Sequence, residues 1–299
     1  MIKLKTFGSF TVGNGLTSVQ EGAWRSEKLE KLFVYLAMNR NRGVCIEDIS
    51  EAIWQVEEET DNPVGALKNL AYRLRKALRD ASFGEECIVS VRGGLYKWND
   101  DVEVTIDVEE FDRYINEAEM AFCRSKETAI ESYEKAIALY HGDFLPLRTD
   151  THWFMTLNAF YHSRYVNTVK ALAKLYIDTG CYEKLEQLCT RAIVYERSDE
   201  QIYSYLIVAR MRTKKVQMAF DTYETAKAIM DKDLGVRKTV MLNKVYEELL
   251  SVTKGASSYN IDEVKDDISE ESMNGVFMCG YPVFKEIYQL EVRKSARST

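Results

Sequence analysis

The sequence has no long hydrophobic run and no paired cysteine motif, and each absence excludes a class of protein. Its 3 prolines and 15 glycines are few for this length and favour long uninterrupted helices. No stretch reaches the roughly 18 apolar residues of a membrane-spanning helix, and the first twelve residues alternate basic and apolar side chains without the continuous apolar segment of a signal peptide. The six cysteines are scattered without a CxxC pair, so we expect reduced, mostly buried side chains and no metal site. We therefore expect a cytoplasmic protein that does not associate with membranes.

Motifs of catalysis and nucleotide binding are also missing. The sequence contains no GxxxxGK[ST], GxGxxG or GxSxG motif. The three histidines, His141, His152 and His162, have neither the spacing of metal ligands nor a nucleophile beside them, and His141 is placed to cap a helix end. We predict no catalytic residue, no metal and no cofactor, and hence that the protein is not an enzyme.

Charge is distributed unevenly along the 299 residues, a length typical of about two domains. The net charge is −7, yet residues 1–98 carry 14 basic and 13 acidic side chains, whereas residues 99–254 carry 21 and 26. Within the first part, residues 65–79 include five basic residues and no acidic one. Because the local field matters more than the total charge for meeting phosphates, this segment is compatible with DNA binding.

The first hundred residues show a mixed pattern of strands and helices. It begins with strands within 2–12, with a bend at Gly8 and a tight turn at Asn14-Gly15. Three helices follow: one capped by Ser26, one over 46–54 and one over 63–79 opened by Asn62-Pro63, and the buried face of the first consists of Leu29, Leu32, Phe33, Leu36 and Ala37. A hairpin of 87–91 and 95–98 around Gly93-Gly94 ends the region. This order is typical of a winged helix-turn-helix.

Particular segments strengthen this interpretation. Residues 32–54 combine a leucine-rich helix, a short basic loop and a second helix that ends in a tryptophan, while 73–78 and 89–96 match the end of a recognition helix and a wing. Together they resemble the OmpR/PhoB-type winged-helix DNA-binding domain.

Residues from about 105 to 252 read as consecutive helices with an internal repeat. Leu172 aligns with Leu206 and Ala192 with Ala226 at an offset of 34 residues, which is the tetratricopeptide (TPR) period. Residues 129–136 parallel 219–226 at an offset of 90, so an insertion interrupts the register. The repeats are degenerate, because Lys214 stands where Gly180 predicts a glycine.

Two blocks of this helical region, 136–145 and 233–250, resemble the bacterial transcriptional activator domain of the Streptomyces antibiotic regulatory protein family. The resemblance implies a transcriptional activator that binds promoter DNA, contacts RNA polymerase and forms a homodimer on direct repeats. The expected fold is mainly α: a winged helix-turn-helix (α+β) followed by an all-α, TPR-like domain. The expected parts are the winged helix at 1–100, the activator domain at 105–252, an acidic linker at 253–274, and the start of a further, incomplete domain at 275–299.

The helix over 63–79 carries the predicted DNA contacts, because its apolar stripe leaves a polar and basic face outward. The candidate DNA-binding residues are Lys68, Asn69, Tyr72, Arg73, Lys76, Arg79 and, at the tip of the wing 88–97, Arg92. Asn69 is the candidate for reading adenine, and Lys68 and Tyr72 for bases or phosphates. Arg73, Lys76 and Arg79 are candidates for holding the backbone, and Arg92 for the minor groove or a phosphate. Arg40 and Arg42 are weaker phosphate candidates.

Other interpretations of these features stay open. The basic helix face is also what an ordinary solvated surface looks like, and the tryptophans are best explained by core packing. The alternative function is a TPR-type scaffold or adaptor whose winged helix binds protein rather than DNA. We further expect residues 1–100 to fold alone, with the repeats burying their faces against each other.

Overall fold

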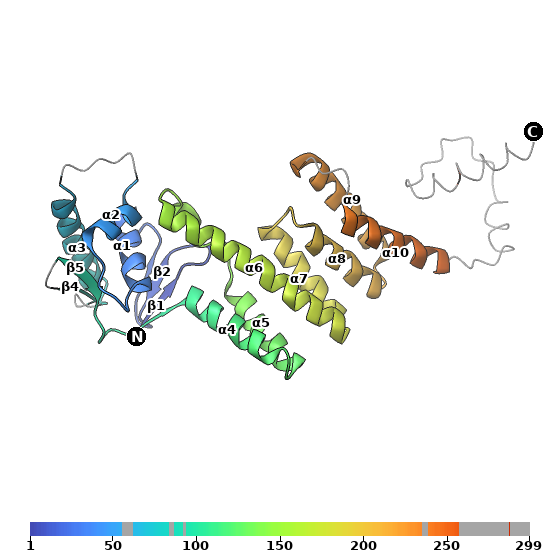
Figure 1. The fold of residues 1–299 in the computed structure, drawn as a ribbon, viewed down its shortest axis with the longest axis horizontal. Helices are drawn as coiled ribbons and strands as arrows, with labels where there is room; N and C mark the ends of the chain where they lie inside the picture. The colour runs from blue at the N-terminus through green and yellow to red at the C-terminus, as the bar shows by residue number, and fades with distance from the viewer. Residues whose placement is uncertain (56–61, 84–86, 92–93, 235–238, 257–286, 288–299) are drawn as a thin grey trace, which may run out of the picture. The chain divides into compact units, whose positions relative to one another are not determined.

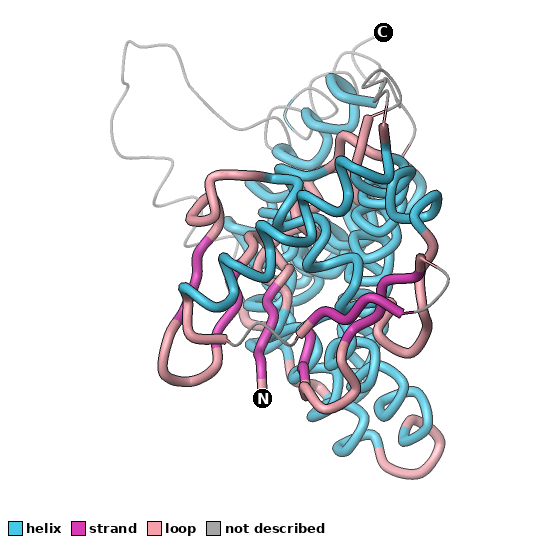
Figure 2. The backbone as a smooth tube through the Cα atoms, turned by 90° about the vertical axis from the view of Figure 1, so that its left-hand side faces the viewer, coloured by secondary structure: helices cyan, strands magenta, loops and turns pink. Residues whose placement is uncertain are grey.

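The computed structural model describes residues 1–55, 62–83, 87–91, 94–234, 239–256 and 287 (Figure 1). The chain divides into two compact units, Met1–Leu250 and Ser251–Thr299. Figure 2 looks onto the N-terminal elements of that unit, with the strands in magenta in front of the repeat helices.

A small sheet begins the fold. Its strands, in the spatial order β3-β2-β1-β6, are β3 (Ser18–Gln20), β2 (Thr11–Gly13), β1 (Ile2–Lys5) and β6 (Val104–Ile106). Along β1, Ile2 and Leu4 are buried while the two lysines are exposed, the period-two pattern of a strand with one face on the core. β1 pairs in parallel with β6. The strands within 2–12 are confirmed, whereas β3 and β6 were not predicted.

Both predicted bends of this region are confirmed. Asn14 closes the β2–β3 turn with its side-chain oxygen, which accepts the backbone N–H groups of Leu16 and Thr17 at 3.0 and 2.9 Å. Gly15 has a φ of +88°, and Gly8 a φ of +84°. A Cβ on Gly8 would lie 2.7 Å from the carbonyl oxygen of His141. Glycine is therefore required at position 8 by close packing as well as by the bend.

Three helices follow as predicted: α1 (Glu27–Met38), α2 (Ile46–Ile53) and α3 (Pro63–Asp80). The expected apolar faces of α1 and α3 are buried, whereas on the expected face of α2 Ile49 and Ile53 are buried and Ile46 and Trp54 are half-buried. Ser26 is the residue before α1, but the prediction that its side chain caps the helix is wrong, because it makes no capping hydrogen bond. Glu27 and Glu30 in the first turn place negative charge at that N-terminus instead.

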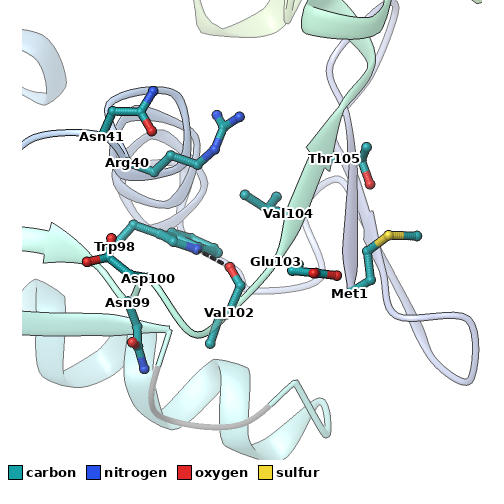
Figure 3. A pocket seen from close by; sticks show the side chains of 10 residues that line it. All are labelled: Met1, Arg40, Asn41, Trp98, Asn99, Asp100, Val102, Glu103, Val104 and Thr105. Atoms are coloured by element: carbon teal, nitrogen blue, oxygen red, sulfur yellow. Dashed lines mark hydrogen bonds between the residues drawn. The ribbon is translucent and has the colours of Figure 1, made fainter.

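The predicted hairpin is confirmed in its backbone. β4 (Ile88–Val91) and β5 (Leu95–Trp98) are antiparallel, with Val91 opposite Leu95. Val44, in the segment between α1 and α2, joins the hairpin through a pair of backbone hydrogen bonds of 2.8 and 2.9 Å with Tyr96. The indole N–H of Trp98 then donates to the carbonyl oxygen of Val102 at 2.8 Å (Figure 3) and shapes the turn toward β6.

The rest of the unit is helical. Its elements are α4 (Asp107–Ala121), α5 (Lys126–Leu139), the short 3₁₀ helix η1 (Pro146–Arg148), α6 (His152–Thr179), α7 (Tyr182–Tyr195), α8 (Glu200–Arg212), α9 (Val216–Leu234) and α10 (Val240–Ala256). Among the described residues, no helix is both long and apolar enough to cross a membrane.

The 34-residue repeat is present in the backbone. α7 begins at Tyr182 and α9 at Val216, 34 residues later. Gly180 ends α6 with a φ of +72°, and Lys214, its counterpart after α8, has a φ of +62°. The repeat is thus degenerate in sequence, but Lys214 adopts the same left-handed conformation that glycine supplies at the other helix end.

The N-terminal elements and the helices from α4 to α8 share one hydrophobic core, while α9 and α10 pack with α8 in a second cluster. Phe7 packs its ring against those of Phe111, Tyr140 and Tyr161, at centroid distances of 5.2, 4.9 and 5.7 Å. The expectation that the repeats bury their faces only against each other is therefore wrong. The 28-residue α6 is the cause, since it begins beside α2 and then continues along α7 (Figure 1).

Three smaller expectations concern the cysteines, the linker and the C-terminal segment. Of the described cysteines, two are buried, Cys87 and Cys189, and three are half-buried or exposed, Cys45, Cys181 and Cys123. The prediction that the cysteine side chains are mostly buried is therefore wrong. α10 continues to Ala256, so the first residues of the expected linker at 253–274 are helical. The rest of that linker lies outside the described residues, as does the segment 275–299 apart from residue 287.

Candidate nucleic-acid interface

Helix α3 has two chemically distinct faces. Its buried residues are Leu67, Leu70, Ala71, Leu74 and Leu78, at the spacing predicted for a core stripe. They pack toward α1 and α2, the two other helices of the N-terminal part. Because that stripe is fixed in the core, the opposite face of α3 is held outward.

All predicted contact residues on α3 lie on this outward face. The exposed side chains are those of Lys68, Asn69, Tyr72, Arg73, Lys76 and Arg79. Arg75, on the edge of the buried stripe, is half-buried. Within the described residues, neither Lys68 nor Lys76 makes an ion pair, so both ammonium groups are available to an outside anion.

The start of α3 is built as the sequence predicts. The side-chain oxygen of Asn62 accepts the backbone N–H of Gly65 at 2.9 Å, and Pro63 occupies the first turn. No acidic residue lies in that turn, so the positive end of the helix dipole is not neutralised from within the helix. The N-terminal half of α3 therefore combines exposed amide and ammonium groups with a positive helix end.

The hairpin contributes less to the described site. Arg92, its predicted contact, lies outside the described residues. Gly94 has a φ of +81°, as a tight hairpin turn requires. Lys97 on β5 forms an ion pair with Asp100, so its charge is partly compensated within the protein.

Of the two arginines between α1 and α2, one is engaged elsewhere. Arg40 donates to both carboxylate oxygens of Glu109 on α4, with 2.8 Å between Nη2 and Oε2. The hypothesis that Arg40 binds phosphate is therefore not supported, because its guanidinium fork is already occupied. Arg42 is exposed and donates to the side chain of Asn39 at 3.0 and 3.2 Å.

A cluster of charges around the buried pair of Arg148 and Glu30 positions α1, and no local sequence pattern indicates it. Arg148, only 4% exposed, donates to Glu30 at 2.6 Å and lies 3.3 and 3.5 Å from Glu21 and Glu27. Glu30 is itself only 2% exposed. Arg148 ends η1, whereas Glu27 and Glu30 lie in the first turn of α1 and Glu21 lies in the segment before it, more than a hundred positions away.

Contacts beside that cluster extend the junction. Lys31, 2% exposed, forms an ion pair with Asp150, and the hydroxyl of Thr151 donates to the carbonyl oxygen of Ala52 on α2 at 2.8 Å. Burial favours a higher pKa for Asp150, but hydrogen bonds from Lys31 and Gln55 outweigh it and lower the pKa. The segment 146–151 is thus anchored on both helices that support α3.

A second junction joins the sheet to α4. Asp107 accepts hydrogen bonds from the backbone N–H of Thr6 at 2.7 Å, the hydroxyl of Thr6 at 2.7 Å and the N–H of Phe7 at 2.9 Å. Burial raises the pKa of Asp107, while these hydrogen bonds oppose the rise. The carboxylate fixes the start of α4 against β1.

His162, which no sequence pattern singles out, lies between two carboxylates. Its ring nitrogens are 2.8 Å from Asp143 and 3.1 Å from Glu196, and the hydroxyl of Tyr140 donates to Asp143. The hydrogen bond with Asp143, reinforced by Glu196, raises the pKa of His162 from 6.5 to about 9. The imidazolium thereby ties the loop after α5 to α6 and to the end of α7. Among the described residues no group of acidic, histidine and cysteine side chains is suited to holding a metal.

The helical part matches a known domain family. Residues 106–250 match the model of the bacterial transcriptional activator domain. The transcriptional regulator RedD of Streptomyces coelicolor is 23% identical over 238 residues, which cover 79% of this chain and 67% of RedD.

A solved structure is similar over most of the chain. Mycobacterium tuberculosis EmbR, in complex with a low-affinity phosphopeptide, superposes with a TM-score of 0.64 at 19% identity and covers 91% of this chain and 72% of its own. At this level of identity the likeness is one of fold, and it extends beyond the residues that match the activator domain.

Proposed function

We propose that this protein is a sequence-specific DNA-binding regulator of transcription. In this proposal residues 1–100 form a winged helix of the OmpR/PhoB type that places α3 in the major groove. The hairpin at 88–97 then meets the adjacent minor groove or backbone. The observation that carries the proposal is the outward face of α3, where exposed cations and an amide project from a helix fixed by its opposite face.

The charge pattern of α3 supports binding to phosphates. Between Gly65 and Arg79 the helix has five basic residues and no carboxylate, although the whole chain has a net charge of −7. An acidic protein with one concentrated basic helix binds DNA in one orientation, because the remaining surface is repelled by the phosphates. The same pattern gives no comparable advantage to a protein-binding adaptor.

Individual side chains have distinct roles in this proposal. Asn69 reads adenine through a pair of hydrogen bonds, since its amide matches the donor and acceptor of that base. Arg73, Lys76 and Arg79 hold the backbone, and Lys68 lies where both bases and phosphates are within reach.

The activator role is supported by the comparisons. Residues 106–250 match a transcriptional activator domain, and RedD is a transcriptional regulator. We propose that the helical part supplies contacts to RNA polymerase and to a second copy of the chain, while the N-terminal part supplies the DNA contacts.

The test is DNA binding by the full chain, with sequences enriched from a random duplex library at about 0.15 M salt. Asn69→Ala should lose roughly 1–3 kcal/mol of discrimination between the enriched duplex and random DNA. Asn243→Ala, which removes an exposed asparagine of α10, is the matched control and should lose none. The proposal fails if no sequence is enriched, or if Asn69→Ala discriminates as well as the unaltered chain.

A further inference from the structure

Two apolar side chains interrupt the basic face of α3. Val64 is 43% exposed and Tyr72 is 66% exposed, although the helix already has a complete buried stripe. Val64 is not among the contact residues predicted from the sequence, because the helical period places it at the edge of that stripe. Its exposure becomes visible only in the structure.

These side chains belong to one ridge of the helix surface. Residues four apart on an α-helix form a continuous row, and one such row of α3 consists of Val64, Lys68, Tyr72 and Lys76. Apolar and cationic side chains alternate along it.

The floor of the major groove offers one apolar group to such a row. Each thymine carries a 5-methyl group there, and apolar side chains discriminate A·T pairs by contact with it. The N-terminal part of a recognition helix is the part that meets base edges, and Val64 lies in the first turn of α3.

We propose that Val64 and Tyr72 are specificity-determining residues that contact the 5-methyl groups of two thymines, while Lys68 and Lys76 between and beyond them meet acceptors or phosphates. This inference rests on the proposed function. Eight residues of helix rise about 12 Å, so the two thymines lie at most about four base pairs apart. With Asn69 on adenine, the recognised sequence is rich in A·T pairs at its centre.

The experiment uses the full chain and the duplex enriched above. Each dT is replaced singly by dU, which removes the methyl group and leaves base pairing intact. Affinity should fall about fourfold at each of two positions, the effect of burying one methyl group. At one of these positions the Val64→Ala variant should bind the dT and dU duplexes with equal affinity. At the other position the Tyr72→Ala variant should do so. Tyr72→Phe should keep its methyl dependence because the ring makes the contact.

Val194→Ala, at an exposed valine of α7, is the control and should respond to dU as the unaltered chain does. Enrichment of a sequence whose affinity no dU substitution changes would overturn this inference and leave the proposed function standing. A methyl effect that persists undiminished in both Val64→Ala and Tyr72→Ala would also overturn it. Failure to enrich any sequence would instead count against DNA recognition itself.

Discussion

The face of α3 and the junction around Arg148 contain the same types of charged residue in opposite environments. On α3, Lys68, Arg73 and Lys76 are exposed, whereas Arg148 and Lys31 are buried beside carboxylates that lie far away in the sequence. Exposed cations cost little and remain available to a ligand, while buried ones require partners in fixed positions. The difference teaches that a cation's role here follows from its burial. The exposed set is suited to binding, and the buried set positions α1 and α2, the two helices against which α3 packs.

The largest expected effect concerns the separation of the two parts. A fragment of residues 1–100 lacks β6, Asp107 and the rings that cover Phe7, so it should not unfold cooperatively. A fragment of residues 1–250 should do so. Thermal and urea unfolding followed by circular dichroism and tryptophan fluorescence will distinguish them. This replaces the expectation that the first hundred residues fold alone, and a stable, cooperative 1–100 fragment would show that the junction is dispensable.

Removing the central cation of the junction should have the next largest effect. Arg148→Met leaves Glu30 buried without its partner and should lower the free energy of unfolding by about 3–5 kcal/mol. Lys126→Met, which breaks an exposed pair with Asp178, should cost about 1 kcal/mol or less. Equal losses in the two variants, measured by urea denaturation of the full chain, would contradict the contrast drawn between buried and exposed charges.

Local patterns explain what the sequence predicted well. The Asn62 cap of α3, the apolar periods of α1 and α3, the turn at Asn14-Gly15 and the hairpin all depend on neighbouring residues, and the structure has each of them, whereas the predicted Ser26 cap of α1 is absent. The 34-residue repeat could also be predicted, because aligning the sequence with itself at that offset is enough to detect it. The outward orientation of Lys68, Asn69 and Tyr72 followed from the buried stripe alone.

The features that escaped prediction depend on residues distant in sequence. Nothing near Arg148 indicates that it pairs with Glu30, and nothing near Arg40 indicates Glu109. β6 is a three-residue strand recognisable only through its pairing with β1. His162 acquires its environment from Asp143 and from Glu196, the residue that follows α7.

The ion pairs of His162 predict a pH dependence of smaller size. Its pKa is higher in the folded protein, about 9 against 6.5, so its contribution to stability is fully present below about pH 6.5. That contribution is lost as the pH rises through about 9. Because the ring is partly exposed, we expect a loss of about 1–2 kcal/mol. His162→Gln should show a smaller decline between pH 6.5 and 9.5 in urea denaturation, and an identical decline would exclude His162 as its source.

The salt dependence of DNA binding tests the central claim, that the exposed face of α3 binds DNA, most directly. If about four to six phosphates are neutralised per protomer, the logarithm of the binding constant should fall against that of the salt concentration with a slope of roughly −4 to −5. Lys76→Ala should reduce the magnitude of that slope by about one. Lys174→Ala, at an exposed lysine of α6, should leave it unchanged. A flat salt response of the unaltered chain, or the same slope in Lys76→Ala, would contradict the assignment of α3 as the DNA-binding helix.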